Sequence, residues 1–348
     1  MLGISNDTVF RKYGIVDSAS GEIVMFQHFD KDFDGTFDVI LFQPRIKANS
    51  EKTYIARPLK TMPEFVSKVY SRFVPERTDD YAWENDRVAF RTFGPKAQQM
   101  AEHNITGGTL TSGIDCWLKK VDYPIIDSWY EKHTSGKGSY HVDTGEGFDN
   151  FHVGTSRGCG GIGVWENDTL WTSKNFTKWQ RLANGPIRTT FKLEYASWNV
   201  NGKSVEETQI ISLDLGSNLT KTEVFLTATN SVTVGITLHE KTGEVSANPD
   251  LSWFSYWEPF PEEEYQMGMA VVLNPKYFVN DRKYISLLKD HSHLFIDMKT
   301  HDGSAVYYSG FTWTKSGQFA NKKLWENYLT EFVVKMRNPL KLKYSKPQ

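Results

Sequence analysis

The sequence predicts a mainly β protein: a large antiparallel β-sandwich, formed as one domain by residues 1–348 and completed by a C-terminal helix. Short segments in which β-branched and aromatic residues alternate with polar ones recur along the chain, the pattern of half-buried strands. Turn signals such as Asn201-Gly202 separate several of them, which is typical of antiparallel hairpins. The segments expected to form strands are 87–93, 188–196, 207–213, 222–228, 232–238, 269–273, 293–298 and 305–314.

One helix is expected at the end of the chain. Apolar side chains recur at helical spacing, and Pro339, which cannot continue a helix, follows them. We expect this stripe to pack on the core. Its members are Leu324, Tyr328, Leu329, Phe332, Val333 and Met336.

The amino-acid composition limits the kinds of molecule that the protein is expected to bind. The net charge of −2 indicates no basic surface for a nucleic acid. No segment approaches the ~20 apolar residues of a membrane helix, so no membrane insertion is expected. Aromatic residues make up 14% of the chain, which suits stacking on sugar rings as well as filling a β core. The two cysteines, Cys116 and Cys159, are expected to be buried thiols, with a single disulfide as the alternative.

Residues 30–38 resemble an oxygen-ligand calcium loop in their spacing. Carboxylates occupy positions 1, 3, 5 and 9, and Gly35 occupies position 6, where the loop must turn sharply. A strand-like segment follows, so this is not an EF-hand, and an acidic hairpin is the alternative. The expected ligands of a structural calcium ion are Asp30, Asp32, Asp34, Thr36 and Asp38.

Two further segments place charged residues on one face of an expected strand. In W-E-N-D-R-V-A-F-R (83–91), alternation puts Arg87 and Arg91 together, where they can bind a carboxylate or pair with the protein's own acids. In residues 113–119, Asp115, Trp117 and Lys119 share a face that is either a ligand site or a solvated strand edge.

The run from Tyr140 to Trp165 is the strongest candidate for a site. It is rich in glycine, yet it also collects His141, His152 and Arg157, which ordinary turns rarely combine. These groups suit acid–base chemistry on an anionic substrate. The run also holds three acids, Asp143, Glu146 and Asp149.

These clusters, with G-P-I-R at 185–188 and W-T-K-S-G at 313–317, resemble a bacterial domain family long of unknown function. That family occurs beside polysaccharide-degrading enzymes, and its characterised activity is the dehydration of ulvan oligosaccharides. The resemblance extends from the Asp30 loop to the terminal helix. It implies a supersandwich like that of galactose mutarotase, export to the periplasm, and loss of water across C4–C5 of a non-reducing-end glucuronate or iduronate.

Such an elimination needs a cation for the carboxylate, a base for the C5 proton and an acid for the C4 hydroxyl. We assign His141 and His152 to proton transfer, with Tyr140 as the alternative acid or base. Arg157, with Arg87 or Arg91, is expected to hold the carboxylate of an anionic oligosaccharide. Lys119 and Trp165 complete the expected substrate contacts, and no organic cofactor is expected.

Three other classes of function stay open at this stage. A polysaccharide lyase performs the same elimination but expels a sugar. A glycoside hydrolase needs two carboxylates, which Asp143, Glu146 and Asp149 can supply. A non-catalytic carbohydrate-binding protein would use Trp117 and Trp165 as stacking platforms.

Overall fold

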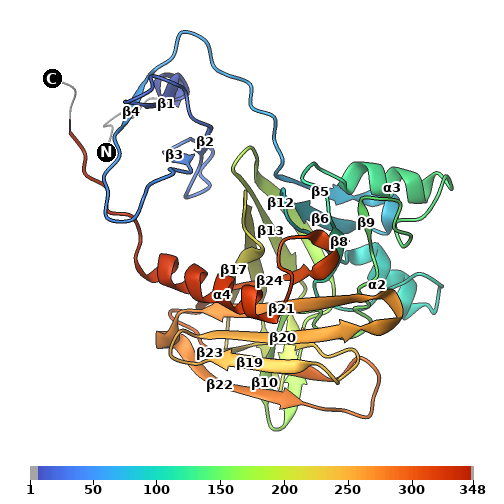
Figure 1. Cartoon of the computed structure of the whole chain (residues 1–348). Helices are drawn as coiled ribbons and strands as arrows, with labels where there is room; N and C mark the ends of the chain where they lie inside the picture. Colours follow the sequence, from blue (N-terminus) through green and yellow to red (C-terminus); the bar gives the residue numbers. More distant parts are fainter. Residues whose placement is uncertain (1–6, 346–348) are drawn as a thin grey trace.

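The computed structural model describes residues 7–345, and its largest element is an eight-stranded antiparallel sheet (Figure 1). Alternation along its strands sends one set of side chains into the sandwich and the other set outward. In spatial order the strands are β12 (Phe176–Asn184), β13 (Arg188–Tyr195), β16 (Glu207–Asp214), β17 (Leu219–Leu226), β24 (Ser304–Trp313), β21 (Tyr265–Leu273), β20 (Trp253–Phe260) and β19 (Glu244–Asn248).

Two five-stranded sheets form the facing layer. The first is β11 (Thr169–Trp171), β10 (Cys159–Glu166), β18 (Ser231–Thr237), β23 (His293–Lys299) and β22 (Phe278–Tyr284). The second is β5 (Tyr70–Val74), β6 (Asp80–Glu84), β7 (Ala89–Thr92), β8 (Asp115–Lys119) and β9 (Gly147–Phe148). A parallel bridge between Ile114 and Gly158 joins them where β8 and β10 begin.

The main core lies between these layers. It is lined by inward-facing residues such as Trp83 of β6, Phe191 of β13 and Tyr307 of β24, all of them buried. The predicted sandwich is therefore confirmed, and all eight expected segments are strands with ends shifted by a few residues. Cys116 and Cys159 are free, buried thiols in this core, as expected.

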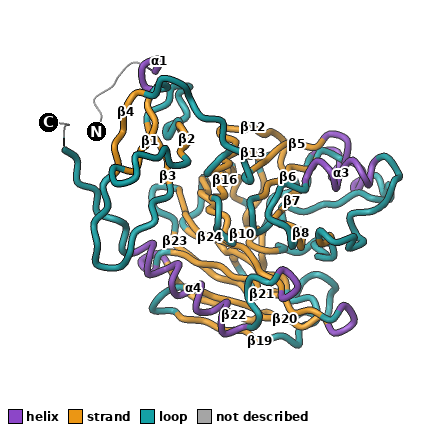
Figure 2. The backbone as a smooth tube through the Cα atoms, turned by 45° about the horizontal axis from the view of Figure 1, so that its top comes forward, coloured by secondary structure: helices purple, strands orange, loops and turns teal. Residues whose placement is uncertain are grey.

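The predicted C-terminal helix, α4 (Lys322–Arg337), is also confirmed, and it lies across the outer face of the eight-stranded sheet (Figure 2). Its fully buried side chains are Trp325, Leu329 and Val333, which pack on Trp253 of β20 and its neighbours. Leu324, expected in the stripe, is instead 45% exposed. The buried stripe is thus centred one residue further along, at Trp325, because that indole lies in the contact with the sheet, and Asn321 caps the start of the helix.

Within residues 7–345, three small two-stranded sheets lie outside the sandwich layers. α1 (Asp7–Phe10) leads into two small sheets, β1 (Tyr13–Asp17) with β4 (Tyr54–Pro58) and β2 (Phe26–Phe29) with β3 (Val39–Phe42), which stand apart from the sandwich in Figure 1. The Gln27 amide ties them to it by bonding backbone groups of Ile187 and Arg188. The expected Asn201-Gly202 turn joins β14 (Trp198–Val200) to β15 (Lys203–Val205).

Short helices complete the chain. α2 (Pro95–Glu102) follows β7, and α3 (Ile126–Thr134) covers the outer face of the β5–β9 sheet, on the side away from the main core (Figure 1). Single 3-10 turns are η1 (Pro75–Arg77), η2 (Pro261–Glu263), η3 (Pro275–Tyr277) and η4 (Thr314–Ser316). The layer between α3 and its sheet holds the densest group of buried charges.

Candidate functional site

Arg91 of β7 lies at the centre of this layer, on the outer face of the sheet. Its guanidinium contacts three buried carboxylates: Asp115 at 2.6 Å, Asp149 at 2.8 Å and Asp80 at 3.5 Å. Antiparallel registry places Arg91 opposite Asp115 on β8, and Asp80 comes from the neighbouring strand β6. One guanidinium group therefore forms ion pairs with three carboxylates.

Three carboxylates around one cation cannot all ionise freely where water is excluded. Burial raises the pKa of Asp80 to about 6, and burial together with the Asp149 charge raises the pKa of Asp115 to about 7. Burial also raises the pKa of Asp149 to about 6. Among the described residues, Asp80 Oδ1 and Asp115 Oδ1 have no hydrogen-bond partner, which fits a proton held within the group near neutral pH.

The Tyr140 hydroxyl lies against this group. It accepts a hydrogen bond from Arg77 Nε at 3.0 Å and another from Arg91 Nη1 at 3.2 Å. The ring is only 1% exposed and packs beside Trp117 and Tyr130 under α3. Two guanidinium donors aimed at one phenolic oxygen are the surroundings that stabilise negative charge developing there.

Two imidazoles flank the Tyr140 ring. His133, at the end of α3, stacks on it with ring centroids 4.2 Å apart, and His141 lies 4.6 Å away. His141 Nδ1 donates to the Asp149 carbonyl at 2.7 Å, so the neutral ring carries its lone pair on Nε2. Burial, reinforced by Arg77, lowers the pKa of His133, which keeps that ring neutral at neutral pH. The side chain of His141 is 52% exposed, so the site is open to solvent on this side.

A buried ion pair positions α3 over the site. Lys119 donates to the Glu84 carboxylate at 2.7 Å and to the carbonyls of Asn85 and Tyr123. Glu84 in turn accepts the backbone N–H groups of Ile125 and Ile126, so it caps the start of α3. Lys119 is 1% exposed, and all three of its N–H donors are bound within the protein. The expected contact between Lys119 and the substrate is therefore wrong, and its role is structural.

Arg87 and Arg157 also lie elsewhere than expected. Asn85 forms a turn that places Arg87 before β7 begins, where its Nε donates to Asn218 rather than facing the Arg91 aspartates. Arg157 is buried and donates to the Thr111 and Ser112 hydroxyls. Burial lowers the pKa of Arg157 to about 10. Neither guanidinium contacts Tyr140.

His152 and Trp165 lie in other surroundings. His152 Nε2 is 3.1 Å from Asp290 in the connection between β22 and β23, and its carbonyl accepts from His239. Arg282 lies 4.1 Å above the Trp165 ring and covers one of its faces. No contact described within residues 7–345 joins His152 or Arg157 to His141, so the expected single cluster of these three residues is not what the geometry shows.

Sequence reasoning missed Arg77 and His133. His133 had a weak signal, because it lies seven residues before Tyr140 in a segment that also carries Trp129 and Tyr130. No sequence signal pointed to Arg77, because it lies in η1, a single turn without a recognisable residue pattern. Trp117, considered as a sugar platform, is fully buried beneath α3.

The Asp30 loop joins β2 to β3, so it is a hairpin connection. Carboxylate oxygens of Asp30, Asp32 and Asp34 lie within 4.8 Å of one another, as shared cation ligands must. Asp38 instead accepts the backbone N–H of Lys31 and lies outside that trio. The donor set suits a hard cation such as calcium, whose binding stays a prediction.

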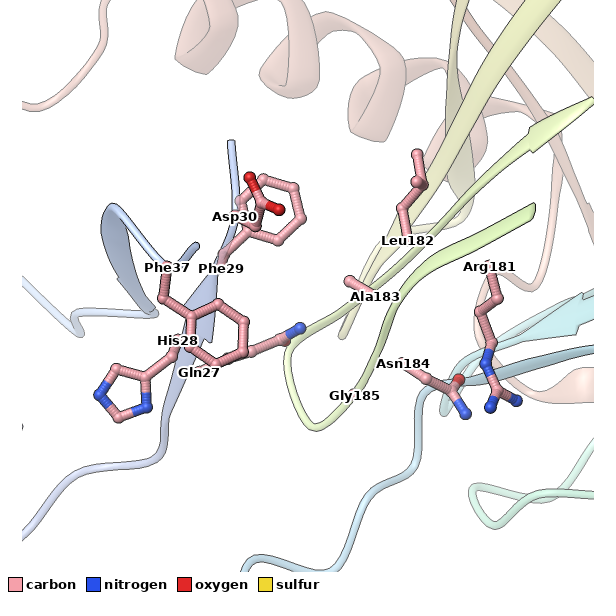
Figure 3. Close-up of a pocket in the computed structure, with 10 residues that line it drawn as sticks. All are labelled: Gln27, His28, Phe29, Asp30, Phe37, Arg181, Leu182, Ala183, Asn184 and Gly185. Atoms are coloured by element: carbon pink, nitrogen blue, oxygen red, sulfur yellow. The ribbon is translucent and has the colours of Figure 1, made fainter. Parts of the chain in front are cut away.

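A pocket of about 320 Å³ lies next to this loop, between the β2–β3 and β12–β13 hairpins (Figure 3). Its lining includes His28, Asp30, Arg181 and Asn184, and none of its residues belongs to the Tyr140 group. It lacks an acid and a base held together by hydrogen bonds. The arrangement suited to proton transfer is therefore the one at Tyr140.

Comparison with known proteins places the chain in a family. Residues 4–342 match the family described as "Domain of unknown function (DUF4861)". The chain belongs to this family. A relative from Formosa agariphila, named only "Uncharacterized protein P7", is 46% identical over 338 residues, which cover 96% of this chain and 85% of that protein. No helix within residues 7–345 is long and apolar enough to cross a membrane.

Similarity to solved structures is weak. A heparinase III with methylated lysines is 15% identical with a TM-score of 0.37, covering 75% of this chain and 39% of that one. The galactosidase domain of an α-galactosidase–sucrose kinase is 8% identical with a TM-score of 0.33, covering 70% and 41%. The DUF4861 chain thus spans about two fifths of each, and any statement about its chemistry rests on its own site.

Proposed function

We propose that this DUF4861 protein is an oligosaccharide dehydratase of the periplasm. It removes water across C4–C5 of a non-reducing-end glucuronate or iduronate in ulvan-type oligosaccharides and leaves a 4,5-unsaturated uronate. One observation carries the proposal: the Tyr140 hydroxyl is held between the Arg77 and Arg91 guanidinium groups, with His133 and His141 against its ring.

The reaction divides into two proton transfers. His141 Nε2 takes the C5 proton, and the electron pair of the C5–H bond forms the C4=C5 double bond as the C4–O bond breaks. The Tyr140 hydroxyl gives its proton to the departing C4 oxygen, which leaves as water. The phenolate so formed is stabilised by its two guanidinium neighbours, and the proton on His141 returns to Tyr140 to restore the starting state.

The positions of the two groups support these roles. His141 is half exposed and its Nδ1 is held by a carbonyl, so a lone pair is available on a ring that cannot rotate freely. The Tyr140 hydroxyl lies between two guanidinium donors, which favour negative charge that develops on its oxygen during proton transfer. Dehydration of a terminal sugar expels only water, so the site needs no subsite for a departing sugar. This requirement is compatible with a site that α3 covers on one side.

Incubation with ulvan-derived oligosaccharides tests the proposal. Dehydration predicts loss of one water mass together with new ultraviolet absorbance from the conjugated double bond. Chain cleavage with that absorbance identifies a lyase, and cleavage without it identifies a hydrolase. An unchanged mass with parental Tyr140 in place contradicts the proposal for these substrates.

A further inference from the structure

Arg77 differs from Arg91 in its partners. Its Nε donates to the Tyr140 hydroxyl, and its Nη1 donates to the Thr78 hydroxyl at 2.9 Å. Both acceptors are neutral oxygens, and no ion pair within residues 7–345 involves Arg77. A guanidinium carries five N–H donors, so Arg77 retains donors beyond these two. It is partly buried rather than enclosed, unlike Arg91.

The backbone beyond Arg77 is held in an uncommon conformation. Thr78 and Asp79 both have positive φ, 51° and 64°, which non-glycine residues rarely adopt. Gly94 makes room for this turn, because a Cβ there would lie 1.9 Å from the Asp79 carbonyl oxygen. The Thr78 carbonyl accepts the backbone N–H of Ala97. The start of α2 and the glycine before it therefore pack directly against the turn that follows Arg77.

The surrounding charges leave Arg77 available. Arg91 contacts all three aspartates, and burial raises the pKa of each of them. Arg77 lowers the pKa of Asp80 and Asp149 through space but bonds to neither of them. The other titratable groups facing it are His133, whose pKa is lowered by burial and by Arg77, and Tyr140. An added anion therefore meets a cation whose donors are not saturated.

We propose that Arg77 is the anion-binding residue of this site and that its ligand is the carboxylate of an acidic sugar. That the carboxylate belongs to a sugar rests on the proposed function. Because Arg77 also contacts Tyr140, a carboxylate on its free donors lies next to the Tyr140 hydroxyl. This assignment replaces Arg87 and Arg157, whose donors face Asn218 and buried hydroxyls.

Binding of two small probes tests the assignment without requiring turnover. Glucuronate and its neutral analogue glucuronamide are titrated by NMR into the parent, into Arg77→Gln and into the control Arg181→Gln. Like Arg77, Arg181 has no carboxylate partner among the described residues, but it is exposed and lies at the pocket of Figure 3. The parent and the control should prefer glucuronate by about tenfold to a hundredfold, and Arg77→Gln should lose that preference.

A measurement on the parent keeps the test independent of how well Arg77→Gln folds. The Arg77 Nε–H resonance, assigned by its absence from the Arg77→Lys spectrum, should shift with glucuronate and stay unchanged with glucuronamide. An unmoved resonance, or an Arg77→Gln variant that retains the parental preference, overturns the assignment. A carboxylate preference without dehydration of ulvan oligosaccharides leaves Arg77 as the anion site and overturns the reaction instead.

Discussion

Replacing Tyr140 by Phe removes one oxygen from the centre of the proposed site. The ring and its packing against Trp117 remain, but Arg77 Nε and Arg91 Nη1 lose their acceptor. A buried donor left without a partner costs about 1–3 kcal/mol, so the free energy of unfolding should fall by that order. Loss of a positioned acid typically lowers turnover about 10²–10⁴-fold, far more than the change in folding explains.

Tyr130→Phe is the matched control. Tyr130 is equally buried in the same aromatic group, and its hydroxyl donates to Asp80 at 3.0 Å. It should lose a similar amount of stability while keeping turnover within about tenfold of the parent. Urea unfolding measures the first quantity, and initial rates of double-bond formation on ulvan oligosaccharides measure the second. The reasoning fails if Tyr140→Phe keeps near-parental turnover, or if both variants lose turnover equally.

Three other predictions follow from the contacts. His141→Ala should lower initial rates about 10²–10⁴-fold, whereas His152→Ala, whose ring faces a different loop, should keep them within about tenfold; equal losses in both would contradict the assignment. The Asp115 pKa is raised from its unfolded value to about 7, so its contribution to stability is complete below pH ~4 and declines as pH rises towards 7. Urea unfolding of Asp115→Asn should therefore show a weaker decline with pH than the parent, and parallel curves would refute this. Calcium should raise the melting temperature of the parent but not of an Asp30→Asn, Asp34→Asn variant, because only a folded loop brings these carboxylates together; a melting temperature that a chelator leaves unchanged in the parent would exclude the site.

Local patterns were sufficient for the longer strands that form most of the eight-stranded sheet. Residues 232–238 alternate apolar and polar side chains, and residues 207–213 are rich in β-branched residues, so both strands could be placed from the sequence to within a few residues. Asn201-Gly202 specified its hairpin because both residues tolerate the positive φ of that turn. Before residue 59 the sequence indicated only the strand that follows the Asp30 loop, which is β3. The strands β1, β2 and β4 were harder to predict, since they are short and belong to two-stranded sheets.

The site was predicted only in part. Tyr140 and His141 were found because the glycine-rich run gathers reactive side chains in one short segment, a signal that depends on local composition. Arg91 was found through strand alternation, but its role was not. Alternation shows which residues share a strand face and says nothing of which partners another strand brings to that face.

The sequence by itself determined the β-sandwich, the terminal helix and the segment that carries the reactive groups, because each is encoded by periodicity or composition over a few residues. Only the tertiary structure decided which charged side chains pair within the protein and which can bind a ligand. Lys119 pairs with Glu84 from another strand, and Arg91 pairs with aspartates from three separate segments. Arg77 keeps free donors because its partners are the hydroxyls of Thr78 and of Tyr140, which lies 63 residues further along the chain. Such long-range pairings depend on how strands associate, and that information is absent from any single stretch of sequence.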